Sequence, residues 1–230
     1  MKSKKVISQV AVLLVLANVL GVAFLDFQGM QHMRLTSTVV FLILFVWLKG
    51  YKNVLLLLAF FSLVCADFFI HFFETVRYAN IALGFRGLAA ICICLDILPK
   101  IIRLKYRPTT MVMLFSVALL NVFLLYKLLN LTQMATKDSS LAVVVLFYGA
   151  LHVFLAILAF TYSYGYGTVE ARFCLVFVYA IIISNVLTSS AYYLGFDILY
   201  YFSRPLYVLG LAGMLAYSVL DFDKKKPLEI

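Results

Sequence analysis

The sequence predicts an all-α fold: a polytopic membrane bundle of eight transmembrane helices that forms one integral membrane domain over residues 1–230. Two observations carry this prediction. Hydrophobic residues make up 65% of the 230 residues and charged residues only 13%, whereas soluble domains are nearer half apolar and a quarter charged. The apolar residues also fall into long runs separated by short polar segments, and about 20 apolar residues suffice for a helix to cross a bilayer.

Each apolar run predicts one helix. The eight helices are expected over residues 6–25, 34–48, 54–73, 80–98, 110–129, 141–162, 171–193 and 204–220. The first is too long for a signal peptide and lacks a small-residue cleavage site. The second is short for a span, and the polar letters DFQGMQHM before it predict a loop, with Arg34 at the membrane interface. Pro99 is expected to end the fourth helix because proline cannot donate a backbone hydrogen bond.

The distribution of basic residues predicts the orientation. Eight spans place both termini on one side of the membrane. Thirteen basic residues fall on that side: Lys2, Lys4, Lys5, Lys49, Lys52, Lys100, Arg103, Lys105, Arg107, Arg172, Lys224, Lys225 and Lys226. The other side has Arg34, Arg77, Lys127, Lys137 and Arg204. Short basic loops face the cytoplasm, so both termini are expected there. The net charge of +9 then indicates contact with anionic lipid and no nucleic-acid partner.

Asp67 is the residue around which a function is expected. It lies within the apolar run VLLLLAFFSLVCADFFIHFF, and His71 follows one turn later on the same helix face. A carboxylate at membrane depth costs at least about 2.5–3.5 kcal/mol on insertion scales, so it normally faces the bundle interior and has a role.

Depth along the helices places other polar residues near Asp67. Arg86 lies at a similar depth on the next, antiparallel helix, and an ion pair with Asp67 is expected. Ser184, Asn185 and His152 are expected to converge with them on a polar pocket that opens toward the outer leaflet. Simpler roles are open for each: a structural ion pair, a hydrogen-bonded histidine or interhelical hydrogen bonding by the asparagine.

Several chemistries have no motif in this chain. There is no P-loop, GxSxG, HExxH or paired CxxC sequence. The four cysteines lie in apolar segments and are expected to pack as small hydrophobic residues. No metal and no cofactor is therefore expected.

Short segments resemble the YhhN family of eight-helix membrane proteins, which includes the lysoplasmalogenases. YKNVLLLLAFFSLVCADFFIHF is similar to the third helix of that family, with Ala66-Asp67 at its small-residue–Asp position. FVYAIIISNVLTSSAYYLGF resembles the seventh helix, with Ser184-Asn185 where Ser-Asp is usual and Ser-Asn also occurs in bacterial members. SRPLYVLGLAGMLAYSVL is similar to the last helix, including Tyr207.

Two family features are altered. Arg34-Leu35 stands where the family has Lys-Pro-Leu, and ALGFRGLAA offers Arg86 where a histidine is frequent.

The resemblance implies a membrane hydrolase that cleaves the vinyl ether bond of a lysophospholipid by acid catalysis. Asp67 would donate the proton and Asn185 would orient the attacking water. The substrate-binding residues would be Ser184, Arg86, His71, His152 and Tyr207. A bacterial inner (plasma) membrane is the expected location, and a membrane lipid or lysophospholipid the expected partner. The sequence sets no oligomeric state.

An alternative is a non-catalytic membrane protein that binds a lipid or small amphiphile in the same pocket. Asn185 cannot serve as a base or neutralise a cation, and Arg86, if paired with Asp67, would keep that carboxylate ionised. Whether the chain is an enzyme therefore stays open at this point. A small-solute or proton carrier is a third possibility, although no matched pair of Gly/Pro-broken helices marks a transporter site.

Overall fold

The computed structural model describes residues 2–48, 50–72, 75–102, 104, 108–136 and 139–219. Eight α-helices and three short 3₁₀ turns make up its regular structure. The α-helices are α1 (Lys2–Phe24), α2 (Phe27–Trp47), α3 (Val54–Phe69), α4 (Val76–Ile101), α5 (Pro108–Thr136), α6 (Ser139–Tyr166), α7 (Val169–Leu194) and α8 (Tyr200–Val219). The 3₁₀ turns are η1 (Gly50–Lys52), η2 (Ile70–Phe72) and η3 (Asp197–Leu199).

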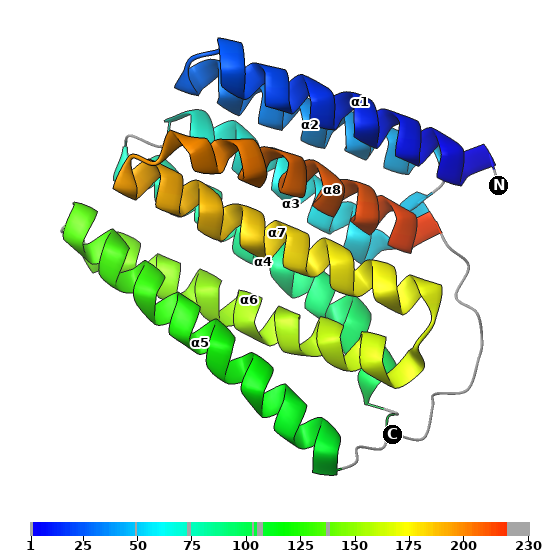
Figure 1. Cartoon of the computed structure of the whole chain (residues 1–230). Coiled ribbons are helices and arrows are strands. Elements are labelled where there is room, and N and C mark those ends of the chain that lie inside the picture. Colours follow the sequence, from blue (N-terminus) through cyan, green and yellow to red (C-terminus); the bar gives the residue numbers. More distant parts are fainter. Residues whose placement is uncertain are drawn as a thin grey trace.

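The helices form two layers that pack face to face (Figure 1). One layer has the order α2, α3, α4, α6, and the other has the order α1, α8, α7, α5. Residues of α2 and α8, and of α6 and α7, meet across the layers. Side chains buried between the layers can therefore come from five or six helices at once.

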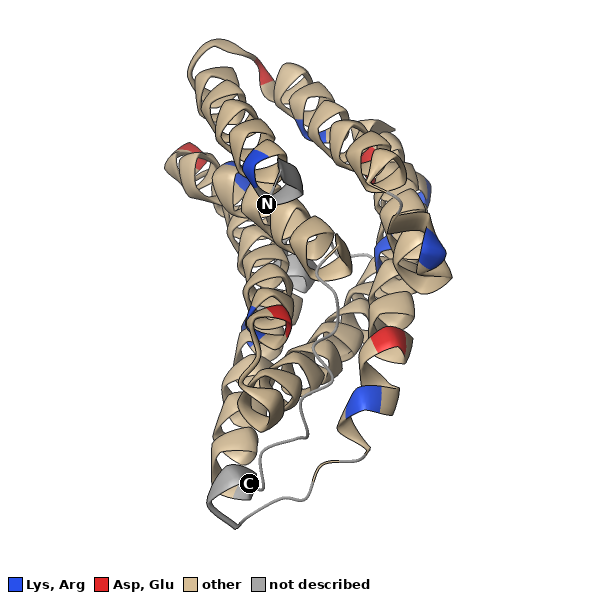
Figure 2. Cartoon of the chain, turned by 90° about the vertical axis from the view of Figure 1, so that its right-hand side faces the viewer, with Lys and Arg blue, Asp and Glu red and all other residues tan. Residues whose placement is uncertain are grey.

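The helices have the length and composition of membrane spans. Within the described residues, seven are long and apolar enough to cross a membrane: all except α5, whose apolar segment Val112–Lys127 is shorter. The predicted all-helical fold is confirmed, and the chain is an integral membrane protein by these criteria. Figure 2 views the bundle from the end at which the chain begins, with its Lys and Arg residues in blue.

The prediction of a loop before the second helix is wrong. The helix α2 starts at Phe27, seven residues earlier than expected, because the side chain of Asp26 caps it by accepting a hydrogen bond from the backbone N–H of Gly29 at 2.8 Å. Arg34 therefore lies about two turns inside the helix. It is 1% exposed and is buried inside the bundle.

Proline affects two helix ends in different ways. Pro99 does not end α4, which continues to Ile101, and the N–H of Ile102 donates to the carbonyl oxygen of Leu98 at 3.3 Å. Pro108 is the first residue of α5, a position at which the missing N–H costs no helical hydrogen bond. The helix consequently begins two residues before its predicted start.

Two glycines let α7 and α8 approach closely. A Cβ atom added to Gly210 would lie 2.7 Å from Cγ1 of Ile181, and one added to Gly213 would lie 2.9 Å from Cβ of Phe177. The Phe177 Cβ is fixed by its own backbone and cannot move aside by a change of rotamer. Small residues at helix interfaces are a general device of membrane bundles.

We predict that Gly213→Ala destabilises the protein by about 1–3 kcal/mol, the usual cost of overpacking. Thermal unfolding of the purified protein in a mild detergent measures this effect. Gly84→Ala is the matched control, since nothing lies within 4 Å of the Cβ that it adds to α4. Equal unfolding temperatures for the two variants would contradict the tight α7–α8 contact.

Candidate functional site

Asp67 is fully buried near the end of α3 and is surrounded by four donor side chains. Its Oδ1 lies 3.0 Å from Nε of Arg34 and 3.3 Å from Nη2 of Arg86. Its Oδ2 accepts hydrogen bonds from the hydroxyls of Thr38 and Tyr207, both at 2.6 Å. The predicted pair between Asp67 and Arg86 is confirmed. Both carboxylate oxygens are occupied, so the group is an ionised acceptor in this arrangement.

Asn185 extends this arrangement across the layers. Its Oδ1 accepts hydrogen bonds from Nη1 of Arg86 at 3.2 Å and from Nη2 of Arg34 at 3.4 Å. Its Nδ2 donates to the hydroxyl of Tyr148 at 2.8 Å. The amide therefore takes the acceptor role that a second acid would fill, without its negative charge. We call Arg34, Thr38, Asp67, Arg86, Asn185 and Tyr207 the central cluster.

The geometry of the helices explains why these side chains meet. Arg34 and Thr38 are one turn apart on α2 and share a face. The guanidinium of Arg34 also stacks on the ring of Tyr207, with its Cζ 3.9 Å from the ring centroid. The central cluster thus joins α2, α3 and α4 of one layer to α7 and α8 of the other.

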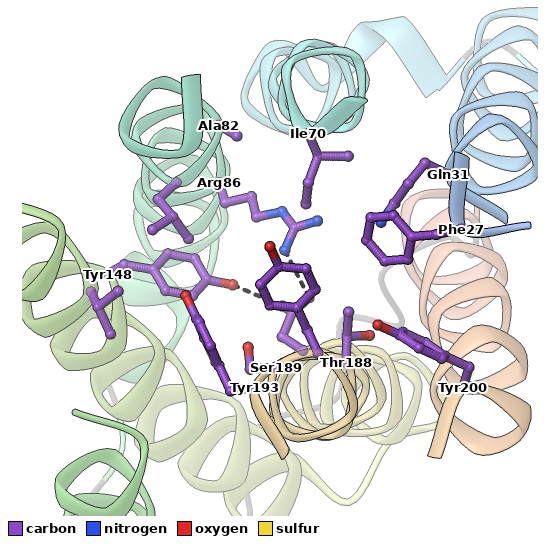
Figure 3. A pocket seen from close by; sticks show the side chains of 14 residues that line it. Phe27, Gln31, Ile70, Ala82, Arg86, Tyr148, Thr188, Ser189, Tyr193 and Tyr200 are labelled. Atoms are coloured by element: carbon purple, nitrogen blue, oxygen red, sulfur yellow. Dashed lines mark hydrogen bonds between the residues drawn. The ribbon is translucent and has the colours of Figure 1, made fainter. Parts of the chain in front are cut away.

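A cavity borders the central cluster on the side of Arg86. Its wall comes from α2, η2, α4, α6, α7 and α8, at the end of the bundle away from the N-terminus. Figure 3 shows Arg86 and Tyr148 on its wall, together with Ser189 and Tyr193. We call it the main cavity. The lining residues are Phe27, Gln31, Ile70, Ala82, Leu83, Arg86, Val145, Tyr148, Asn185, Thr188, Ser189, Tyr192, Tyr193 and Tyr200.

The wall is mostly apolar with a few polar groups, which is typical of ligand sites. Asp67 is not among the lining residues. Two neighbouring cavities also include Arg86, Tyr148 and Asn185 in their walls, one toward Tyr207 and one between α5, α6 and α7. Arg86, Tyr148 and Asn185 are therefore the polar residues that all three cavities share, while Asp67 lines none of them.

The other predicted site residues lie in different places. His152 borders the two neighbouring cavities, and its Nδ1 lies 2.9 Å from the carbonyl oxygen of Tyr148. The hydroxyl of Ser184 donates to the carbonyl oxygen of Ser203 at 2.7 Å, which joins α7 to α8 away from the cavities.

His71 lies in η2, directly after the end of α3. Its Nδ1 is 3.0 Å from the backbone oxygen of Asp67, and its Nε2 is 2.9 Å from Nδ1 of His32. The carbonyl can only accept, so Nδ1 of His71 carries the proton. Among the described residues, no three His, Cys, Asp or Glu side chains are arranged to hold a metal ion.

Sequence reasoning missed four residues of this region: Arg34, Thr38, Tyr148 and Arg204. The N-cap residue Asp26 is the signal that would have placed Arg34 within the second helix. Arg204 was expected at the outer end of the eighth helix, whereas α8 begins at Tyr200, about one turn earlier.

Arg204 is the least compensated of these residues. It is 2% exposed, and its Nε, Nη1 and Nη2 all lack a hydrogen-bond partner among the described residues. Its Cζ lies 5.5 Å from the centroid of the Tyr200 ring. Asp67 pairs with Arg34 and Arg86 but not with Arg204, and an unpaired arginine within a span costs at least about 2.5–3.5 kcal/mol.

The fold and the site define the protein as a helical integral membrane protein with an arginine-lined cavity between its two layers. Comparisons with family models, with curated proteins and with solved structures find no match to this chain.

We predict that Asp67→Asn lowers the free energy of unfolding by about 3–5 kcal/mol, because it leaves Arg34 and Arg86 buried without an anion. Chemical or thermal unfolding in detergent measures the change. Asp26→Asn is the matched control: Asp26 is exposed, and asparagine caps a helix about as well as aspartate. A similar, small effect of both substitutions would show that the carboxylate charge of Asp67 is not needed by its neighbours.

Proposed function

We propose that the protein binds a membrane lipid or a similar amphiphile in the main cavity and leaves it chemically intact. The observation that carries this proposal is the position of Asp67 relative to the cavity. Arg86, Tyr148 and Asn185 line the cavity, whereas both oxygens of Asp67 are held by two arginines and two hydroxyls behind them. A mostly apolar wall with convergent polar groups suits a ligand that has a chain and a polar head.

Vinyl ether hydrolysis, which the resemblance to the YhhN family implies, is the competing proposal. It needs a carboxylic acid that gives its proton to a carbon atom of the substrate, within contact distance of that atom. The polar centre where Asp67 and Asn185 meet through Arg86 favours it. The two arginines on the carboxylate and its absence from the cavity wall favour binding without chemistry.

The orientation is also a proposal. Both termini are proposed to face the cytoplasm, and the membrane is proposed to be a bacterial plasma membrane. The described residues Lys5, Lys52, Lys100 and Arg172 lie near the helix ends on the side of the N-terminus, in support of this orientation.

We expect a green fluorescent protein fused to the C-terminus to fluoresce in bacterial cells, because it folds in the cytoplasm. Alkaline phosphatase at the same position should be inactive. An active phosphatase fusion without fluorescence would reverse the proposed orientation.

Incubation of the purified protein with a lysoplasmalogen distinguishes binding from hydrolysis. We predict that the lipid is retained and recovered unchanged by mass spectrometry, without release of fatty aldehyde. Aldehyde release by the wild-type protein that Asp67→Asn abolishes would overturn this proposal in favour of the hydrolase.

A blocked cavity provides the control for retention. Ser189→Phe places a ring in the wall of the main cavity and should reduce the amount of retained amphiphile several-fold, since it removes space that the ligand needs. Ser190→Phe makes the same change at the next residue of α7, which lines none of the cavities described above. Equal retention by both variants would place the ligand elsewhere.

A further inference from the structure

We propose that the ligand of the main cavity carries a negatively charged group, a phosphate or a carboxylate, which completes the charge balance of the three buried arginines. This inference rests on the proposed function, because it specifies the chemical class of the amphiphile. It assigns a role to Arg204, whose guanidinium has no ion pair or hydrogen bond among the described residues.

The first support for the inference is the charge balance of the buried arginines. Arg34, Arg86 and Arg204 are 1%, 7% and 2% exposed. Among the described residues, Asp67 is the one acid that forms an ion pair with any of these arginines, and it pairs with Arg34 and Arg86. Three cations against one anion leave an excess of two positive charges in the membrane interior. Buried charges in spans are normally paired or face a functional site, and a bound anion would supply the missing partner.

The second support is that several guanidinium N–H donors have no acceptor. Nε of Arg86, Nη1 of Arg34 and all three nitrogens of Arg204 have no hydrogen-bond partner among the described residues. Guanidinium groups present several N–H donors in a fixed plane that matches phosphate and carboxylate oxygens. A trimethylammonium head group offers no acceptor to these donors and adds a positive charge, whereas a neutral hydroxyl head group accepts hydrogen bonds but leaves the excess positive charge uncompensated.

The third support is the position of the arginines relative to the cavities. Arg86 lies on the wall of the main cavity, and Arg34 lies on the wall of the neighbouring one. Arg204 stacks on Tyr200, whose ring is itself part of the main wall. Arg86 is thus placed to contact the anion, while Arg34 and Arg204 act from behind it through the low-dielectric interior.

The apolar part of such a ligand also has a place. Leu83, Ile70 and Val145 line the main cavity beside the arginine, and Phe27 and Tyr192 line it nearer the end of the bundle. The geometry therefore suits an anionic head at Arg86 and a chain that continues among apolar side chains.

The experiment compares chain-matched amphiphiles with the full-length protein in neutral maltoside micelles. The ligands are dodecyl phosphate, neutral dodecyl glycerol ether and dodecyltrimethylammonium, with inorganic phosphate as the head group alone. Affinities come from calorimetry and from the shift of the unfolding temperature. We expect dodecyl phosphate to bind on the order of tenfold or more tightly than the other two amphiphiles.

Arg204→Gln should change two measured quantities in opposite directions, the unfolding temperature and the preference for dodecyl phosphate. It should raise the unfolding temperature of the ligand-free protein, because it removes an uncompensated buried cation, and it should reduce the preference for dodecyl phosphate. Arg204→Lys keeps the charge and should keep the preference. Arg77→Gln removes an exposed arginine near the same end of the bundle and should change neither quantity. A lower unfolding temperature for Arg204→Gln with unchanged preference would assign Arg204 a purely structural role and overturn the inference.

The outcomes separate this inference from the proposed function. Equal binding of anionic and neutral chains, abolished by Ser189→Phe, would overturn the anion but keep the amphiphile site. Inorganic phosphate that binds as tightly as dodecyl phosphate would keep the anion site and contradict an amphiphile. Absence of binding by every probe would overturn both.

Discussion

The structure depends on one buried carboxylate that two guanidiniums and two hydroxyls share. Asp67 makes ion pairs with Arg34 and Arg86 at 3.0 and 3.3 Å, and Tyr207 and Thr38 bond its other oxygen at 2.6 Å. These contacts join four helices, and Asn185 adds α7 through the same arginines. In a lipid environment no water replaces a lost partner, so each polar group constrains the others. The two layers are therefore held in register at this point, besides the apolar packing around it.

The same contacts decide which groups a ligand can meet. Because Asp67 is enclosed, the main cavity presents Arg86, Tyr148 and Asn185. A site of this kind offers donors and positive charge, which suits recognition of an anionic group more than donation of a proton to carbon. Asn185 strengthens the contrast. An aspartate there would balance one arginine, whereas the neutral amide leaves the positive charge available to a bound molecule.

The sequence predicted the helices and the acid–arginine pair but not the full set of neighbours. Hydropathy located all eight helices, and depth along antiparallel helices brought Asp67 to Arg86. Arg34 was missed because polar letters over residues 26–33 obscured a helix that Asp26 caps. Arg204 was missed because the eighth helix was expected to begin at residue 204, whereas α8 begins at Tyr200. Depth also cannot tell which side of a polar cluster faces a cavity, since that depends on contacts among helices far apart in sequence, as between Thr38 and Tyr207.

Infrared spectroscopy of the carboxyl groups tests most directly whether Asp67 is a buried anion and not an acid. The measurement compares the wild-type protein with Asp67→Asn at neutral pH, in detergent or in lipid. We expect Asp67→Asn to remove a carboxylate band from the wild-type spectrum. We expect no protonated-carboxyl band to disappear with it. A protonated-carboxyl band that disappears in Asp67→Asn would contradict the account and restore Asp67 as a proton donor.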